Sequence, residues 1–127
     1  MNYAKIRALV IDDQMFARRI VTTLLRQIGF AEVSEACDGA AGLEEVERLL
    51  PDVVICDIEM APMDGLAFLE ALREKKGIPM PKVLFLTNHG ESDIVLKARD
   101  LGVDAFILKP VTGIQLKRRI DHVFHVE

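Results

Sequence analysis

The chain has 127 residues, of which 50% are hydrophobic and 28% are charged, a composition typical of a soluble globular protein. This length suits a single domain spanning residues 1–127. The net charge of −4 argues against a nucleic-acid interface that neutralises phosphates. No apolar run approaches the roughly 20 residues of a membrane span, and the N-terminus lacks the layout of a signal peptide. We therefore expect a cytoplasmic protein that binds neither nucleic acid nor a membrane.

Four short apolar runs predict strands that are buried on both faces, as in a parallel sheet. These runs are Ala8–Ile11, Val53–Cys56, Val83–Leu86 and Ala105–Leu108. A fifth run, Glu32–Ala36, is more polar and fits a strand at the edge of the sheet.

Segments with helical periodicity alternate with these strands. The first carries apolar residues four positions apart: Phe16, Ile20, Leu24 and Ile28. Gly29 follows where a helix end often needs positive φ, and Thr112 and Gln115 have the spacing of a capping box before the last helix. Five alternating strand–helix units predict a doubly wound α/β fold, a five-stranded parallel sheet flanked by five helices.

Polar side chains follow the predicted strands where the carboxyl ends of a parallel sheet meet. They are Asp12 and Asp13 after the first strand, Asp57 after the third, Thr87 after the fourth and Lys109 after the fifth. Each has an ordinary alternative, because aspartate often caps a helix and lysine is usually solvated. Since ligands bind at this edge in such sheets, the five together indicate a site.

The residue types at this edge favour one kind of chemistry. Crowded carboxylates repel one another and raise each other's pKa unless a cation compensates, and Mg²⁺ prefers such oxygen ligands. A carboxylate beside Mg²⁺ can attack a phosphoryl group and form an acyl phosphate. Lys109 and Thr87 can stabilise the charge on the phosphoryl oxygens. The pattern therefore predicts phosphorylation of an aspartate.

The chain resembles the receiver domains of response regulators, in particular the CheY-like single-domain receivers, from Ile6 to about Phe124. The resemblance is carried by five motifs: Asp12-Asp13, the run from Pro51 to Asp57, Met63-Asp64-Gly65, Thr87 and Lys109-Pro110. It implies a CheY-like, flavodoxin-like sheet with strand order 2-1-3-4-5.

The resemblance also implies a role for each polar residue of the predicted site. Asp57 would accept a phosphoryl group from a sensor histidine kinase or a histidine phosphotransfer protein. Mg²⁺ would be held by Asp13, Asp57, Asp12 through water, and the backbone carbonyl of Glu59. Thr87 and Lys109 would contact the phosphoryl group.

Three further residues acquire roles through the same resemblance. Phe106 matches an aromatic switch that remodels the surface of the fourth helix, fifth strand and fifth helix for a protein effector. Glu59 and His89 match positions that tune the lifetime of the acyl phosphate; the alternative is two solvated loop side chains. We expect a monomer, with a weak dimer through the same surface as the alternative.

One motif departs from the family, which usually has proline directly after the methionine of its D-x-x-M-P loop. Here Ala61 follows Met60 and Pro62 comes next. The departure predicts a modestly reshaped loop, in which the Glu59 carbonyl is the proposed Mg²⁺ ligand whose geometry would be affected.

Other functions stay open as alternatives. They are an aspartyl-phosphate-forming phosphohydrolase, a phosphotransfer intermediate in a multistep relay, and an interaction module that is never phosphorylated. Under the main interpretation the chain catalyses only its own phosphorylation and dephosphorylation and is not otherwise an enzyme.

Overall fold

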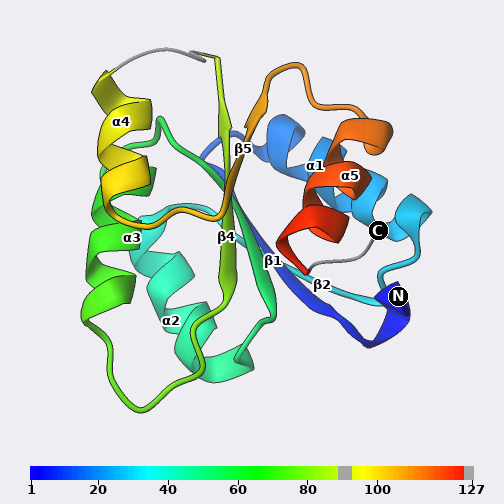
Figure 1. Ribbon diagram of the computed structural model, residues 1–127, viewed down its shortest axis with the longest axis horizontal. Helices are drawn as coiled ribbons and strands as arrows, with labels where there is room; N and C mark the ends of the chain where they lie inside the picture. The colour runs from blue at the N-terminus through cyan, green and yellow to red at the C-terminus, as the bar shows by residue number, and fades with distance from the viewer. Residues whose placement is uncertain (89–92, 125–127) are drawn as a thin grey trace.

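The computed structural model describes residues 1–88 and 93–124. A single sheet of five parallel strands runs through the centre of the molecule, in the order β2-β1-β3-β4-β5 (Figure 1). The strands are β1 (Arg7–Ile11), β2 (Glu32–Ala36), β3 (Val53–Asp57), β4 (Lys82–Thr87) and β5 (Ala105–Leu108). The predicted strands and the predicted order are confirmed, and the more polar β2 lies at an edge.

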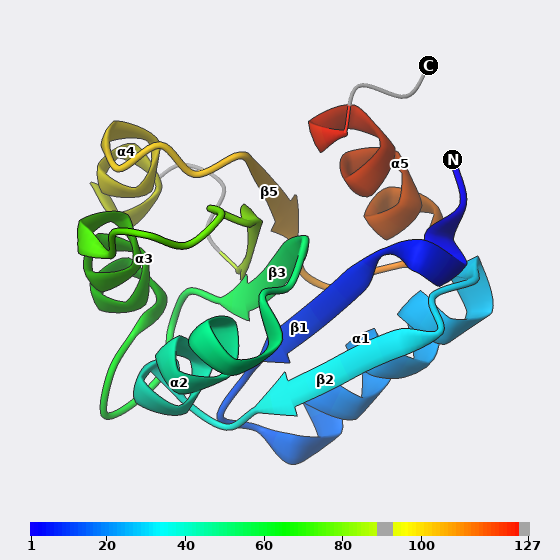
Figure 2. The same cartoon turned by 90° about the horizontal axis from the view of Figure 1, so that it is seen from below.

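Helices cover both faces of the sheet, as Figures 1 and 2 show. The helices are α1 (Met15–Ile28), α2 (Gly39–Leu49), α3 (Gly65–Glu74), α4 (Asp93–Asp100) and α5 (Gly113–Val123), preceded by a short 3₁₀ helix, Tyr3–Lys5. Helices α1 and α5 lie on one face, and α2, α3 and α4 lie on the other. No helix within residues 1–88 and 93–124 is long and apolar enough to cross a membrane.

The hydrophobic core is divided into two parts by the sheet. Residues of β1 alternate between them, so that Val10 packs toward α1 and α5 while Leu9 and Ile11 pack toward α2 and α3. The buried face of α1 is formed by Val21, Thr22 and Leu25. The apolar stripe that predicted this helix is therefore only partly buried, because Phe16 is 82% exposed and Ile20 is 54% exposed.

Local signals in the sequence explain where several helices begin and end. Gly29 ends α1 with φ of 129°, and its N–H donates to the carbonyls of Arg26 and Leu25. Thr112 begins α5 by accepting a hydrogen bond from the N–H of Gln115, as the capping spacing predicts.

Successive strands are added on one side of β1 for β2 and on the other side for β3, β4 and β5, so the strand order switches at β1. The parallel register places Ile11 opposite Cys56, Asp57 opposite Leu86, and Thr87 opposite Leu108. The carboxyl ends of the four strands β1, β3, β4 and β5 therefore lie level at one edge. This edge is where ligands bind in doubly wound sheets.

Candidate functional site: an acidic cluster at the sheet edge

Three carboxylates meet at the carboxyl ends of β1 and β3. Asp12 and Asp13 follow β1, and Asp57 is the last residue of β3. One oxygen from each carboxylate lies within 4.8 Å of the others. Asp12 is 1% exposed and Asp57 is 5% exposed, so this charge is gathered largely out of water.

The hydrogen bonds within the cluster leave oxygens available for a cation. Asp12 Oδ1 accepts from the N–H of Gln14 at 2.8 Å, whereas Asp12 Oδ2 is buried with no hydrogen-bond partner among the described residues. A buried carboxylate oxygen without a partner is costly unless a cation or water completes it. Since all three carboxylates offer hard oxygen ligands within a small space, the residues present fit a divalent cation such as Mg²⁺.

Lys109, the first residue after β5, brings positive charge to this cluster. Its Nζ lies 3.3 Å from Asp57 Oδ1, and its side chain is 24% exposed. Its backbone N–H donates to the carbonyl of Thr87 at 2.8 Å, which holds the start of the β5–α5 loop against the end of β4. Thr87 itself is 2% exposed.

The surroundings raise the pKa values of Asp57 and Asp12. Burial raises the pKa of Asp57 above its ordinary value; Lys109 opposes this effect and Asp12 adds to it. Burial likewise raises the pKa of Asp12, against the hydrogen bond from Gln14 and the charge of Lys109. Loss of hydration is thus the larger cause, and repulsion between the carboxylates, which the sequence suggested, is a smaller one.

The β3–α3 loop closes the site from one side. The N–H of Glu59 donates to Asp57 Oδ1 at 3.4 Å, and the N–H of Ala61 donates to Asp13 Oδ2 at 3.3 Å. Gly65, the first residue of α3, donates its N–H to the carbonyl of Ile58 at 2.9 Å. The backbone of the loop therefore contacts two of the three carboxylates.

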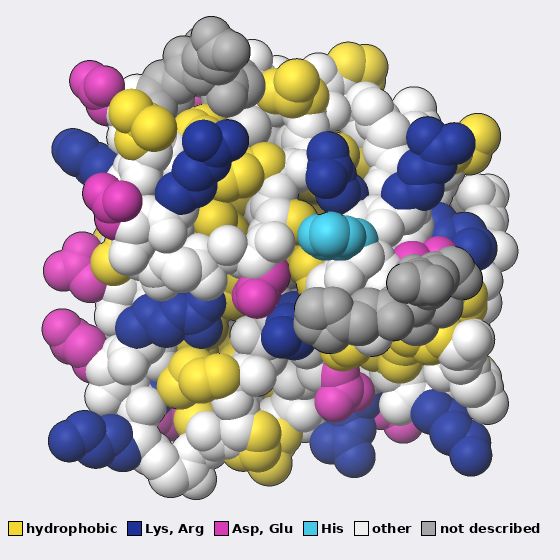
Figure 3. Space-filling model, in the orientation of Figure 1, with side chains coloured by type: hydrophobic (Ala, Val, Ile, Leu, Met, Phe, Trp, Pro, Cys, Tyr) yellow, Lys and Arg dark blue, Asp and Glu magenta, His cyan; other side chains and the backbone are white. Residues whose placement is uncertain are grey.

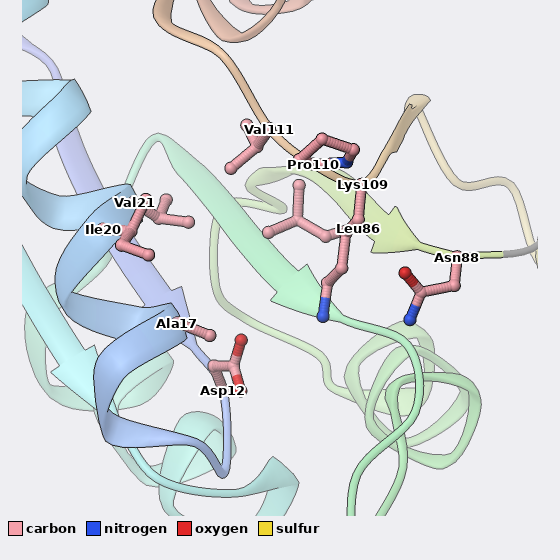
Figure 4. A pocket seen from close by; sticks show the side chains of 9 residues that line it. All are labelled: Asp12, Ala17, Ile20, Val21, Leu86, Asn88, Lys109, Pro110 and Val111. Atoms are coloured by element: carbon pink, nitrogen blue, oxygen red, sulfur yellow. The ribbon is translucent and has the colours of Figure 1, made fainter.

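A cavity of about 400 Å³ opens beside the cluster, between α1 and the segment that follows β5. Figure 4 shows Lys109 extending toward the carboxyl end of β3, with Asp12 on one side and Asn88 on the other. Ile20 and Val111 line its apolar part. The acidic cluster is therefore accessible from a partly apolar hollow.

The structure brings some of the residues predicted from the sequence together and leaves others apart from the cluster or undescribed. Asp12, Asp13, Asp57 and Lys109 come together as described. Phe106 lies on β5, with its ring 6.3 Å from that of Phe85, and lines a different groove from the one beside Asp12. His89 lies outside the described residues.

Sequence reasoning missed one contact of the site, that of Arg18. Its Nη1 donates to the backbone carbonyl of Asp12 at 2.7 Å, and its Nε donates to Glu35 Oε1 at 2.8 Å. Glu35 belongs to β2 and meets Arg18 only through the pairing of β1 with β2. The spacing of residues along the chain carries no signal of this contact.

A doubly wound parallel sheet with this acidic cluster and lysine at its carboxyl edge defines a CheY-like α/β domain. A family model described as the response regulator receiver domain matches residues 8–121. The chain therefore belongs to the response regulator receiver family, whose members act in two-component signalling.

Individual relatives agree with this assignment. The chain is 33% identical over 120 residues to the "Probable chemotaxis protein CheY" of Rhizobium etli, covering 94% of this chain and 93% of that protein. It is 39% identical over 106 residues to "Protein-glutamate methylesterase/protein-glutamine glutaminase 2" of Xanthomonas oryzae pv. oryzae, covering 83% of this chain but 29% of that protein. The solved structure of Vibrio cholerae chemotaxis protein CheY4 superposes with a TM-score of 0.85 at 26% identity, over 93% of this chain and 98% of that one.

Proposed function

We propose that the chain is the phosphoacceptor of a two-component pathway and that Asp57 receives the phosphoryl group from a phosphohistidine. The observation that carries this proposal is the position of Asp57. It ends a buried strand within 4.8 Å of the carboxylates of Asp12 and Asp13 and within 3.3 Å of Lys109. Residues 1–127 would act as one receiver domain in the cytoplasm, as a monomer or a weak dimer.

The proposed transfer uses Asp57 as the nucleophile. A carboxylate oxygen attacks phosphorus, an oxygen–phosphorus bond forms, and the phosphorus–nitrogen bond to the donor histidine breaks with its electron pair left on the imidazole nitrogen. Lys109 and the hydroxyl of Thr87 would stabilise charge on the phosphoryl oxygens.

The carboxylates of Asp12, Asp13 and Asp57 would hold Mg²⁺, with the backbone carbonyl of Glu59 as a further ligand. When bound, this ion supplies positive charge that offsets the approach of an anionic phosphoryl group. The buried, unpartnered Asp12 Oδ2 supports its presence near Asp12.

The signal would leave through the face that carries α4, β5 and α5. A groove there is lined by Thr87, Phe106, Arg99 and Arg118, among others, so that it joins the phosphorylation site to basic side chains. The guanidinium of Arg99 lies 6.0 Å from the centre of the Phe106 ring. Lys and Arg side chains are spread across this face in Figure 3, with hydrophobic side chains between them. Phosphorylation would shift Phe106 and change this surface for a protein effector.

A hydrolase that forms an aspartyl phosphate is the second candidate, because it would use the same acidic cluster. The test is incubation with Mg²⁺ and either acetyl phosphate or p-nitrophenyl phosphate. The receiver assignment predicts one phosphoryl group per chain from acetyl phosphate and no sustained release of nitrophenol. Continuous turnover of p-nitrophenyl phosphate would instead support the hydrolase.

The effector can be sought with beryllofluoride, which mimics a phosphorylated aspartate. We expect a partner to be retained with the mimic and lost without it. The same comparison with an Asp57→Asn variant controls for effects of the reagent. Equal retention by all samples would contradict the switch.

A further inference from the structure

Arg18 is a largely buried charged side chain that contacts the acidic cluster from outside the proposed phosphorylation machinery. Only 14% of its side chain is exposed. It lies in the first turns of α1 and connects two neighbouring strands: Nη1 reaches the carbonyl of Asp12 at the end of β1, and Nε reaches Glu35 of β2. A guanidinium can make both contacts at once because its donors are fixed in one plane.

Arg18 contacts the peptide group between Asp12 and Asp13, the two residues that supply two of the three carboxylates. The carbonyl of Asp12 and the N–H of Asp13 share one rigid plane. The N–H of Asp12 is already bonded to the carbonyl of Ala36, so a second bond on the carbonyl fixes the backbone on both sides of Asp12. Fixing this plane sets the direction in which the side chains of Asp12 and Asp13 leave the backbone.

The charge of Arg18 is balanced on the side away from the cluster. Glu35 Oε1 lies 2.8 Å from Arg18 Nε and 3.2 Å from Arg19 Nε. Glu35 compensates part of the charge of the guanidinium, and the charge of Arg18 still acts on the carboxylate of Asp12.

We propose that Arg18 is a positioning residue for the metal-binding carboxylates: its guanidinium anchors the Asp12–Asp13 peptide to β2 through Glu35. This inference rests on the proposed function, since it concerns the Mg²⁺ that the phosphorylation requires. Groups that orient metal ligands commonly change metal affinity about 10-fold or more when they are removed.

The chain offers a matched control in the neighbouring residue. Arg19 bonds the same oxygen of Glu35 through its Nε, but its side chain is 64% exposed. Arg18→Met and Arg19→Met therefore remove the same charge and the same ion-pair partner of Glu35. They differ in the anchor on the Asp12 carbonyl and in the positive charge that Arg18 places near the Asp12 carboxylate, whose loss alone would favour cation binding.

The experiment compares the natural chain with Arg18→Met, Arg18→Lys and Arg19→Met, using Mg²⁺ titrations followed by amide chemical shifts. We expect Arg18→Met to weaken Mg²⁺ binding by about 10-fold and Arg18→Lys by less, because lysine can keep one contact but not both. Arg19→Met should stay within about two-fold of the natural chain. Unchanged or tighter binding by Arg18→Met would overturn the inference.

A second measurement separates this inference from the proposed function. Without metal, amide hydrogen exchange at Asp12, Asp13 and Gln14 should be faster in Arg18→Met than in Arg19→Met, at matched global stability. Equal exchange in the two variants would overturn the positioning role. Absence of Mg²⁺ binding by the natural chain would instead contradict the proposed function, and the exchange comparison would still decide the role of Arg18. If Arg18→Met does not fold, Arg18→Lys carries both measurements.

Discussion

The backbone N–H of Ala61 donates a hydrogen bond to Asp13 Oδ2, across 3.3 Å between the β3–α3 loop and the end of β1. This bond depends on the position where the sequence departs from the family, because a proline directly after Met60 would have no N–H to donate. Pro62, one residue later, leaves the donor in place. The departure therefore adds a backbone contact to a proposed metal ligand.

Exchanging the two residues tests the importance of that contact. The double variant Ala61→Pro with Pro62→Ala restores the usual order of the family and removes the donor. Because Asp13 loses a group that orients its carboxylate, we expect Mg²⁺ affinity to fall by about 10-fold in calorimetric titrations. Pro62→Ala alone keeps the N–H of Ala61 and serves as the control. Equal affinities for the double variant and the control would show that the bond does not orient Asp13.

The β3–α3 loop has no room for a side chain at position 65, where the chain has Gly65. A Cβ at this position would lie 2.8 Å from Ile58 Cα and 3.0 Å from the carbonyl oxygen of Asp57. Gly65→Ala must therefore push the loop away from the end of β3, and we expect it to lower the free energy of unfolding by about 1–3 kcal/mol and to slow phosphorylation. Urea unfolding and labelling with acetyl phosphate measure the two effects.

Gly113 provides the matched glycine for this prediction. Among residues 1–88 and 93–124, a Cβ there would meet only Leu24 Cδ2, at an ordinary 3.7 Å. Gly113→Ala lies in the first turn of α5, and we expect it to raise the free energy of unfolding by up to about 1 kcal/mol without slowing phosphorylation. A Gly65→Ala variant as stable and as active as Gly113→Ala would contradict the close approach.

Asp57 should make stability depend on pH. Burial raises the pKa of its carboxyl in the folded protein, so folding favours the protonated form, and stability is lost as the pH rises from the unfolded pKa through the folded pKa. Asp57→Asn removes that loss. We expect the variant to be more stable than the natural chain at pH 7 without metal, by about 1 kcal/mol.

The same variant gives a second, sharper readout of this effect. The difference in free energy of unfolding between Asp57→Asn and the natural chain should shrink as the pH falls toward 4, near the ordinary pKa of 3.8. At that pH the carboxyl of the natural chain becomes protonated in both the folded and the unfolded state. Urea unfolding at the two pH values measures it. Glu44→Gln, at an exposed position of α2, controls for a change of one charge. A constant difference between pH 7 and pH 4 would count against the raised pKa.

Lys109 should affect phosphorylation and metal binding in opposite directions. Its ammonium lies 3.3 Å from Asp57 Oδ1, where it would stabilise phosphoryl oxygens but repel a divalent cation. We expect Lys109→Met to slow phosphorylation by acetyl phosphate by about 100-fold. Mg²⁺ should bind the same variant more tightly, as measured by titration. A parallel fall in both properties would indicate general damage to the site instead.

The sequence predicted the fold because each strand and helix carries its own local signal. Short apolar runs marked the strands buried on both faces, and Thr112 marked the start of α5. The three aspartates were predicted to meet because parallel strands end level at one edge, which requires only the topology. The roles assigned to Thr87, Phe106, Glu59 and His89 stay predictions.

Other features depend on tertiary packing that the spacing of residues does not encode. Phe16 and Ile20 fit the apolar stripe of α1, yet both side chains are more than half exposed, because Val21 and Leu25 form the buried face. The contact between Arg18 and Asp12 needs the pairing of β1 with β2 to bring Glu35 within reach. The bond from Ala61 to Asp13 needs the path of the β3–α3 loop.

Locating the phosphoryl group tests the central claim most directly. The chain is treated with acetyl phosphate and Mg²⁺, the acyl phosphate is trapped by borohydride reduction, and peptides are analysed by mass spectrometry. We expect modification of Asp57, no labelling of Asp57→Asn, and loss of labelling when Mg²⁺ is chelated. Modification of Asp12 or Asp13 in the natural chain, or labelling of Asp57→Asn equal to that of the natural chain, would contradict it.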